Sequence, residues 1–149
     1  MLYEMFIKGL MIDPVQNVPI VILRDADGER VLPIWAGPVE ANAIALQIEN
    51  TAPARPMTHD LLRDIIGDLG ATLQRVVIAD LRGATFFAYL ELDRNGERLF
   101  VDARPSDAIA LAMRARARLF VDSKVLDQVK SVDVSSDRAD RERVEAVQV

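Results

Sequence analysis

The chain carries the same ordered set of short segments twice. G-E-R-V-L at Gly28–Leu32 is followed by A-I-A-L at Ala43–Leu46, and G-E-R-L-F at Gly96–Phe100 is followed by A-I-A-L at Ala108–Leu111. In each copy the first segment adjoins a turn rich in Asp and Gly, and the second lies a few residues after a Pro that is typical of a helix start. Such repetition predicts one structural unit used twice.

Hydrophobic patterning gives this unit its elements. Short apolar runs bounded by turn residues predict three strands in each copy, and a helix is expected to begin at the Pro that follows them. The unit is therefore βββα, over about residues 5–50 and again over about 73–116. The predicted strands cover residues 5–13, 19–23, 30–35, 73–80, 85–92 and 98–103.

A helix over about residues 58–69 is predicted to connect the two units. Thr58 is a typical N-cap residue, and Gly70 is typical of the position after a last helical turn. Apolar residues recur between them at helical spacing and predict one apolar face: Leu61, Leu62, Ile65, Ile66 and Leu69. Beyond the second unit, residues 119–121 and 123–129 predict one more short strand and a short helix.

Each βββα unit alone would expose one face of its sheet, so we expect the two units to share one core. A chain of 149 residues has the length of one ordinary domain. The prediction is an α+β fold: a single domain over residues 1–130 with an internally duplicated βββα unit, in which mixed or antiparallel sheets pack against helices. Residues 131–149 are predicted to form a charged tail, either helical or disordered.

Composition narrows the classes of protein and of site. Half of the residues are hydrophobic, Cys is absent, and no apolar run reaches the length of a membrane span. We therefore expect a cytoplasmic protein without disulfides, thiolate metal sites or a Cys nucleophile. The formal net charge is −5 and the isoelectric point is near 4.9, so a site for a polyanion has to be a local patch. Arginines crowd one stretch: Arg104, Arg114, Arg116 and Arg118.

The first candidate for chemistry is His59, the single histidine of the chain. It lies at the expected start of the connector helix, next to Asp60. A solvent-facing imidazole beside a carboxylate is suited to act as a general base or acid near neutral pH. The alternative is purely structural, because an Asp in the first turn of a helix is favoured by the helix dipole. A single His also excludes a zinc site built from several histidines.

The second candidate is the junction D-A-R-P-S-D-A at residues 102–108, where a strand leads into a helix. The carboxylates of Asp102 and Asp107 are groups that hold a divalent cation, and the Arg104 guanidinium is a group that holds a phosphate. Ordinary helix initiation explains the Pro and the Asp equally well, and Glu40 occupies the equivalent position in the first unit. Arg104 and Ser106 have no counterparts there, since the first unit has Gly37 and Val39.

Three blocks of sequence resemble the bifunctional nuclease family, small bacterial proteins whose domain also occurs in plant proteins credited with RNase and DNase activity. The blocks are V-L-P-I-W-A-G-P-V-E-A at 31–41, R-P-M-T-H-D-L-L at 55–62 and R-P-S-D-A-I-A-L-A at 104–112. The resemblance implies a duplicated α+β domain and a nuclease. The residues in these blocks that carry candidate chemistry are Glu40, Arg55, His59, Asp60, Arg104, Ser106 and Asp107.

Two hypotheses follow for function. In the first, the protein cleaves RNA or DNA: His59 activates water or a ribose hydroxyl, and Asp107 with Asp60 or Glu40 binds Mg²⁺ or Mn²⁺. Arg55 and Arg104, with Ser106, would then hold the phosphate. In the second, the chain is a non-catalytic oligomeric module that binds a small anion or a protein partner, which fits its acidic composition. Exposed sheet edges predict a homodimer under either hypothesis.

Overall fold

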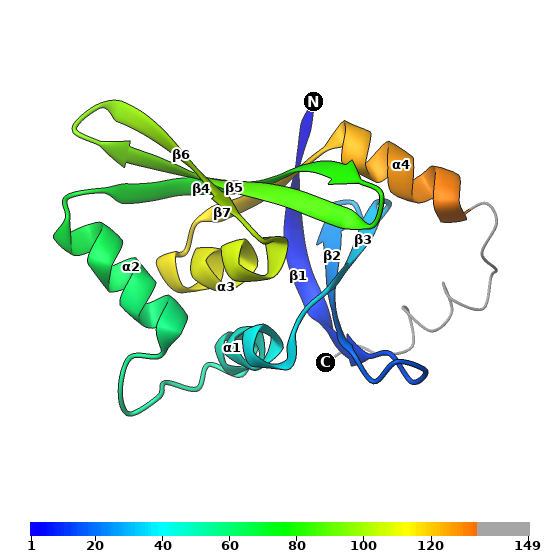
Figure 1. Ribbon diagram of the computed structural model, residues 1–149, viewed down its shortest axis with the longest axis horizontal. Helices are drawn as coiled ribbons and strands as arrows, with labels where there is room; N and C mark the ends of the chain where they lie inside the picture. Colours follow the sequence, from blue (N-terminus) through cyan, green and yellow to red (C-terminus); the bar gives the residue numbers. More distant parts are fainter. Residues whose placement is uncertain (134–149) are drawn as a thin grey trace.

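One continuous sheet of seven strands forms the centre of the molecule in the computed structural model, which describes residues 1–133 (Figure 1). The strand order across the sheet is β3-β2-β1-β7-β4-β5-β6. The strands are β1 (Leu2–Ile12), β2 (Pro19–Asp25), β3 (Val31–Trp35), β4 (Thr72–Arg82), β5 (Thr85–Arg94), β6 (Glu97–Ala103) and β7 (Arg118–Asp122).

The short strand β7 joins the two halves of the sheet. It pairs antiparallel with β1, where Met5 lies opposite Leu119, and parallel with β4, where Val76 lies opposite the same Leu119. All other neighbouring strands are antiparallel. Because β7 covers the inner edges of β1 and β4, the two three-stranded groups form one mixed sheet instead of two, and the only free edges of the described sheet are β3 and β6.

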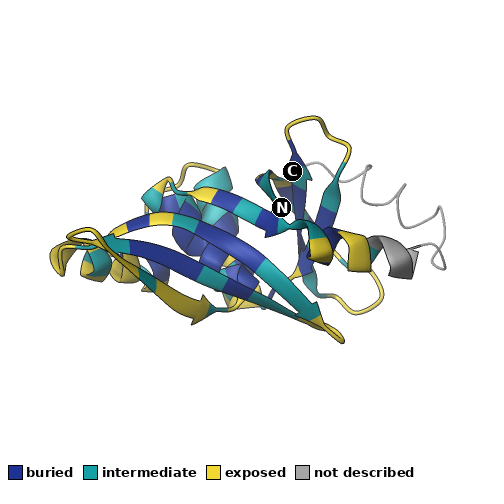
Figure 2. Cartoon of the chain, turned by 90° about the horizontal axis from the view of Figure 1, so that it is seen from above, coloured by how far each residue is buried: buried dark blue, intermediate teal, exposed yellow. Residues whose placement is uncertain are grey.

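Four helices complete the described chain: α1 (Pro38–Ile48), α2 (Thr58–Asp68), α3 (Pro105–Ala115) and α4 (Ser123–Asp133). The central helix is α3, which contacts α1, α2 and strands β3, β4, β5 and β7. Its apolar residues are buried almost completely, as Figure 2 shows for the middle of the molecule. Ile109 and Leu111 of α3 meet Val76, Ile78 and Val121 of the sheet in the main core.

The expected α+β class and the order of the elements are confirmed, with β1-β2-β3-α1 followed, after α2, by β4-β5-β6-α3. That the two groups descend from one duplicated unit stays a prediction. The helix predicted to end at residue 129 continues to Asp133. The charged tail predicted over 131–149 lies outside the described residues except for its first three. No helix within the described chain is long and apolar enough to cross a membrane.

One expectation about α2 is wrong. The N-cap residue is Met57, and Thr58 is already the first helical residue; the Asp60 carboxylate accepts a hydrogen bond from the Met57 backbone N–H at 2.9 Å. The apolar stripe is largely exposed, at Leu61, Leu62, Ile65 and Leu69, while Ile66 packs on the core. The helix instead buries its polar start, His59 and Asp60, because α3 offers polar partners there.

Candidate active site

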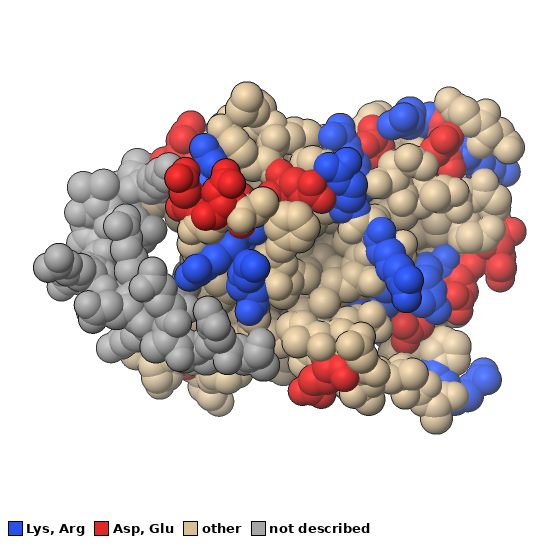
Figure 3. Space-filling view, turned by 180° about the vertical axis from the view of Figure 1, so that it is seen from behind, with Lys and Arg blue, Asp and Glu red and all other residues tan. Residues whose placement is uncertain are grey.

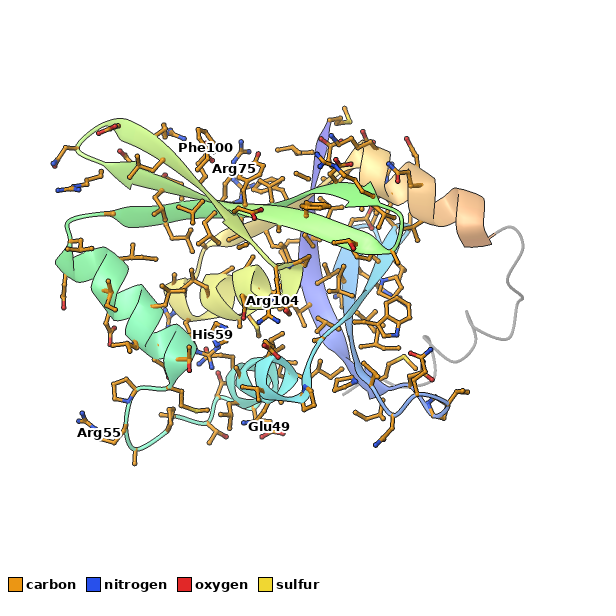
Figure 4. All side chains as sticks on the ribbon, viewed as in Figure 1. Glu49, Arg55, His59, Arg75, Phe100 and Arg104 are labelled. Carbon is orange, nitrogen blue, oxygen red and sulfur yellow. The ribbon has the colours of Figure 1, made fainter. Side chains whose placement is uncertain are left out.

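The first turns of three helices meet on the helix-bearing side of the sheet. Glu40 and Asp107 occupy the third positions of α1 and α3, and His59 occupies the second position of α2. Packing of α3 against both α1 and α2 brings these turns together, and Figure 4 shows His59 and Arg104 between α1 and α3. Helix starts carry partial positive charge, so their meeting point favours anions, whether side chains or ligands.

An unbroken chain of hydrogen bonds joins four of the predicted residues. The His59 ring nitrogen Nε2 lies 2.9 Å from Asp107 Oδ1. Arg104 Nε donates to Asp107 Oδ2 at 2.8 Å, and Arg104 Nη2 donates to Glu40 Oε1 at 2.6 Å. We call these four residues, His59, Asp107, Arg104 and Glu40, the polar cluster. Its members come from three segments that are far apart in the sequence.

The pKa of Asp107 reflects two opposed effects. Partial burial penalises the charged carboxylate and raises the pKa, whereas hydrogen bonds from Arg104 and His59 lower it by more. The resulting pKa lies below the ordinary value, so Asp107 is ionised at neutral pH. Hydrogen bonds to Asp107 and then to Glu40 raise the pKa of the Arg104 guanidinium, which is charged at every pH of interest.

The His59 ring is buried, with 5% of the residue exposed, so the expectation of a solvent-facing imidazole is wrong. An ionised Asp107 can only accept a hydrogen bond, so the proton of that bond sits on Nε2. Every fully buried side-chain nitrogen or oxygen in the described chain has a partner, and the hydrogen bond of this ring is the one through Nε2. The other nitrogen, Nδ1, therefore lies where solvent still reaches the ring.

Asp60, predicted as catalytic and metal-binding, has a structural position instead. One carboxylate oxygen accepts from the Met57 backbone N–H and the other from Arg114 Nε at 3.0 Å. Arg114 is itself 1% exposed at the side chain and donates to the carbonyl oxygens of Ala43 and Ala110. This pair ties α2 to α3 and α1. Both oxygens of Asp60 are thus occupied by protein groups.

Two further predicted residues stand outside the polar cluster. Arg55 is exposed in the loop before α2, and its label in Figure 4 lies well away from those of His59 and Arg104. Ser106 is buried in the first turn of α3, and its hydroxyl has no hydrogen bond to another described residue. The structure therefore brings together His59, Asp107, Arg104 and Glu40, and leaves Arg55, Ser106 and Asp60 in other surroundings.

The polar cluster does not suit the expected Mg²⁺ or Mn²⁺ as a resident ion. A hard divalent cation needs several free oxygen ligands. Each carboxylate of the cluster is already bonded to Arg104, and Asp60 is held by Arg114. Among the described residues, no three His, Asp or Glu side chains are arranged so that they could hold one metal ion. The predicted pair of ligands, Asp107 and Asp60, does not fit a resident cation in this arrangement.

The arginine-rich stretch does not form a cationic patch. Arg114 is buried, Arg104 lies between two carboxylates, and Arg118 makes two hydrogen bonds to Glu4, at 3.0 and 2.7 Å. On the face seen in Figure 3, Lys and Arg side chains alternate with Asp and Glu along the upper edge and form two separate groups across the middle. Three of the four arginines of this stretch therefore have acidic partners in the fold, and Arg116 is exposed without an acidic partner among the described residues.

Sequence reasoning missed two supporting residues. No local sequence pattern indicates the role of Arg114, since its partner Asp60 precedes it by 54 residues. Gly37 precedes α1, and the Glu40 carboxylate lies where a Cβ on residue 37 would stand. The glycine of the G-P-V-E block is the sequence signal for this contact. A side chain at position 37 would push Glu40 away from the place where it meets Arg104.

The fold and the polar cluster define an α+β domain with a His-Asp-Arg-Glu site where three helices begin. The chain belongs to the bifunctional nuclease domain family, whose model matches residues 21–133. An uncharacterized protein of Mycobacterium tuberculosis is 44% identical over 144 residues, which cover 97% of this chain and 85% of that protein.

Plant relatives are more distant. Bifunctional nuclease 2 of Oryza sativa is 30% identical over 121 residues, covering 77% of this chain and 37% of that protein. Bifunctional nuclease 1 of Arabidopsis thaliana is 28% identical over 102 residues, covering 66% of this chain and 31% of that protein. The chain thus spans about a third of the length of these plant proteins.

Proposed function

We propose that this protein hydrolyses phosphodiester bonds of RNA or DNA at the polar cluster. The observation that carries the proposal is the bond from His59 Nε2 to an ionised Asp107, made in a chain that belongs to the bifunctional nuclease domain family. A carboxylate in this position fixes the ring orientation and the tautomer, and leaves the lone pair of Nδ1 as a base.

In the reaction, His59 Nδ1 takes a proton from a water molecule or, in RNA, from the ribose 2′-hydroxyl. The oxygen that loses the proton bonds to phosphorus, and the bond from phosphorus to the leaving oxygen breaks. The imidazolium that forms is stabilised by Asp107 through Nε2–H and can return its proton to the leaving oxygen. Every proton that leaves the nucleophile is thereby accounted for within the site.

Arg104 is the residue placed to bind the phosphate. Its side chain is 66% exposed, and the bonds to Asp107 and Glu40 use two of the five N–H donors of a guanidinium. The other donors are available to phosphate oxygens as negative charge builds up in the transition state. Glu40 holds the guanidinium from the other side and acts as a positioning residue.

Divalent-metal dependence stays a prediction for the cleavage assay. A cation that enters with the substrate would meet ligands on the phosphate itself as well as on the protein. Assays with Mg²⁺, with Mn²⁺ and with EDTA separate the two cases: activity in EDTA means that His59 and Arg104 suffice, and its loss means that a cation takes part.

The test uses labelled single-stranded RNA and DNA with protein purified to homogeneity. We expect His59→Ala and Asp107→Asn to lower the cleavage rate by about 10²-fold or more, with both variants folded by circular dichroism. Asp64→Asn is the matched control, since Asp64 is a partly exposed acid on α2 whose partner among the described residues is its neighbour Arg63, and it should cleave like the wild type. Equal activity in all four proteins would identify a contaminant and overturn the proposal.

A second function is favoured by a separate observation. Four large aliphatic side chains of α2 are exposed, Leu61, Leu62, Ile65 and Leu69, and exposed apolar surface of this kind is typical of interaction sites. A non-catalytic oligomeric module would use such surface and would hold a small anion at Arg104. Absence of cleavage by pure protein, together with a rise in melting temperature on adding phosphate, would favour this second function.

A further inference from the structure

The two free edges of the described sheet differ in how well they resist pairing with another strand. Edge strand β3 carries Pro33 at its centre, and Pro has no N–H to offer a neighbouring strand. Edge strand β6 contains no Pro, and five of its seven residues are exposed. An edge of this kind is a template for another strand, so β6 is the edge on which a further strand can add.

The backbone of β6 offers its free groups at known positions. Strands β5 and β6 are joined by the two-residue turn Asn95–Gly96, both with positive φ, and Arg94 lies opposite Glu97. In an antiparallel ladder closed in this way, alternate residues turn N–H and C=O away from the paired strand. Counted from Glu97, those residues are Arg98, Phe100 and Asp102.

We propose that two copies of this chain pair antiparallel through β6, around a two-fold axis at Phe100. In this register each Arg98 lies opposite the partner's Asp102, Leu99 lies opposite the partner's Val101, and Phe100 lies opposite itself. When R-L-F-V-D pairs antiparallel with a second copy of itself, the basic residue lies opposite the acidic residue and each apolar residue lies opposite an apolar residue. This assembly goes beyond the proposed nuclease function and does not depend on it.

Neighbouring registers lose this match. Centred one residue earlier, on Leu99, the pairing puts Arg98 opposite the partner's Phe100. Centred one residue later, on Val101, it puts Arg98 opposite the partner's Arg104, so that like charges meet. Opposite charges across a strand pair are favourable and like charges are unfavourable. The charges that normally protect an edge therefore select one register here.

The side chains are free to make these contacts. Phe100 is 62% exposed and Val101 is 42% exposed. Asp102 is exposed and its carboxylate has no partner in the described chain. Arg98 donates through Nη1 to the buried Glu91 at 2.9 Å but stays 55% exposed, so its remaining N–H groups can reach the partner's Asp102. The Glu91 contact also fixes Arg98 in place before the copies meet.

Pairing in this register would bring the second copy to the candidate active site. Residue 104 follows β6 directly, and the register places the partner's Gly96 level with Arg104. The β5–β6 turn of the partner would therefore border the polar cluster, and the dimer would hold two sites close to the strand pair that joins the copies.

The chain has no cysteine, so single introduced cysteines report directly on the register. Phe100→Cys puts two thiols on directly opposite residues, whose Cα atoms are about 5.5 Å apart in an antiparallel pair and within disulfide range. Glu97→Cys is the matched control: it is exposed on the same strand, but in this register its two copies lie about 20 Å apart. We expect a disulfide-linked dimer on mild oxidation for Phe100→Cys and little for Glu97→Cys.

Charge reversal tests the same register without covalent bonds. Light scattering after gel filtration should find a dimer for the wild type and a shift to monomer for Asp102→Arg and for Arg98→Asp, both with wild-type circular dichroism. Mixing the two variants should restore a dimer, because every Arg then faces an Asp.

The pairing would be overturned by a monomeric wild type at tens of micromolar, or by equal cross-linking at positions 97 and 100. A dimer that survives both charge reversals and fails to cross-link at position 100 would also overturn it, and would point to the exposed face of α2 as the contact between copies.

Discussion

The same helical position carries three acids with different tasks. Glu40, Asp60 and Asp107 are all third residues of a helix, where a carboxylate suits the helix dipole. Asp60 completes a buried ion pair with Arg114, whereas Asp107 and Glu40 face Arg104. The surroundings, more than the position in the helix, decide which acid is available for chemistry.

The sequence could identify these residues as candidates but could not show which of them lie together in one site. Helix starts at residues 38 and 105 follow from Pro, which is a local signal, whereas Thr58 indicated the N-cap of α2 one residue too late. The contact between His59 and Asp107 joins positions 48 residues apart, and no local pattern predicts which helix starts will meet. For the same reason His59 was expected at the surface and is buried.

Replacing Arg104 by Lys should lower the cleavage rate by about 10²-fold, the effect of losing one donor to a developing oxyanion. A guanidinium has a planar fork of N–H groups that can donate to Asp107, Glu40 and a phosphate at once. Lys has no such fork. Arg118→Lys is the control, since Arg118 is also 66% exposed and also bonds a carboxylate through Nε and Nη2. Single-turnover cleavage of labelled RNA should separate the two variants; equal rates would remove Arg104 from the site.

Asp107 should make folding stability depend on acid pH. Its pKa is lowered in the folded state, so its contribution is complete above the unfolded carboxyl pKa of about 3.9 and is lost as pH falls through the lower folded pKa. The wild type should therefore exceed Asp107→Asn in free energy of unfolding at pH 7, and the difference should shrink below about pH 4. Urea unfolding at several pH values measures this, and a constant difference would contradict it.

At the scale of the elements, β7 is the part that sequence patterns could not place. Its short apolar run predicts a strand, yet only the fold shows that it inserts between β1 and β4 and turns two three-stranded groups into one sheet. Pairing partners depend on the whole core and not on the run itself. In contrast, the hairpins β2–β3 and β5–β6 follow from local turn residues and were predicted correctly.

The helix layer depends on Arg114, which links α1, α2 and α3 through buried hydrogen bonds. Arg114→Met should cost about 3–5 kcal/mol in the free energy of unfolding, because it leaves the Asp60 carboxylate buried without its partner. Adding Asp60→Asn should recover part of the loss, since the unpaired charge is then gone. Urea unfolding measures this cost. The control is Arg63→Met on the exposed face of α2, which should cost at most about 1 kcal/mol in the free energy of unfolding. A similar cost for Arg114→Met and Arg63→Met would contradict this role of Arg114.

Over the whole molecule, charge sets a limit on how nucleic acid is bound. The formal net charge is −5. Arg114 is buried against Asp60 and Arg118 pairs with Glu4, whereas Arg104 is 66% exposed and is the cation of the polar cluster that solvent reaches. Binding should then rest on few phosphate contacts and on the positive ends of three helices.

Salt dependence measures the number of phosphate contacts. For single strands, log K falls with log salt by about 0.7 for each phosphate that the protein neutralises. We expect a slope no steeper than about −1.5, which corresponds to about two contacts, for a catalytically inactive His59→Ala protein in fluorescence titrations. A slope of −4 or steeper would reveal a cationic surface that this account does not contain.

The central claim is that His59, oriented by Asp107, carries the proton in phosphodiester cleavage, and chemical rescue tests it most directly. Labelled RNA is incubated with His59→Ala protein, with and without free imidazole, beside wild type treated in the same way. We expect imidazole to restore a large part of the cleavage to the variant and to leave the wild type unchanged. Full activity of His59→Ala without imidazole would contradict the claim, because the chain has no other histidine to take its place.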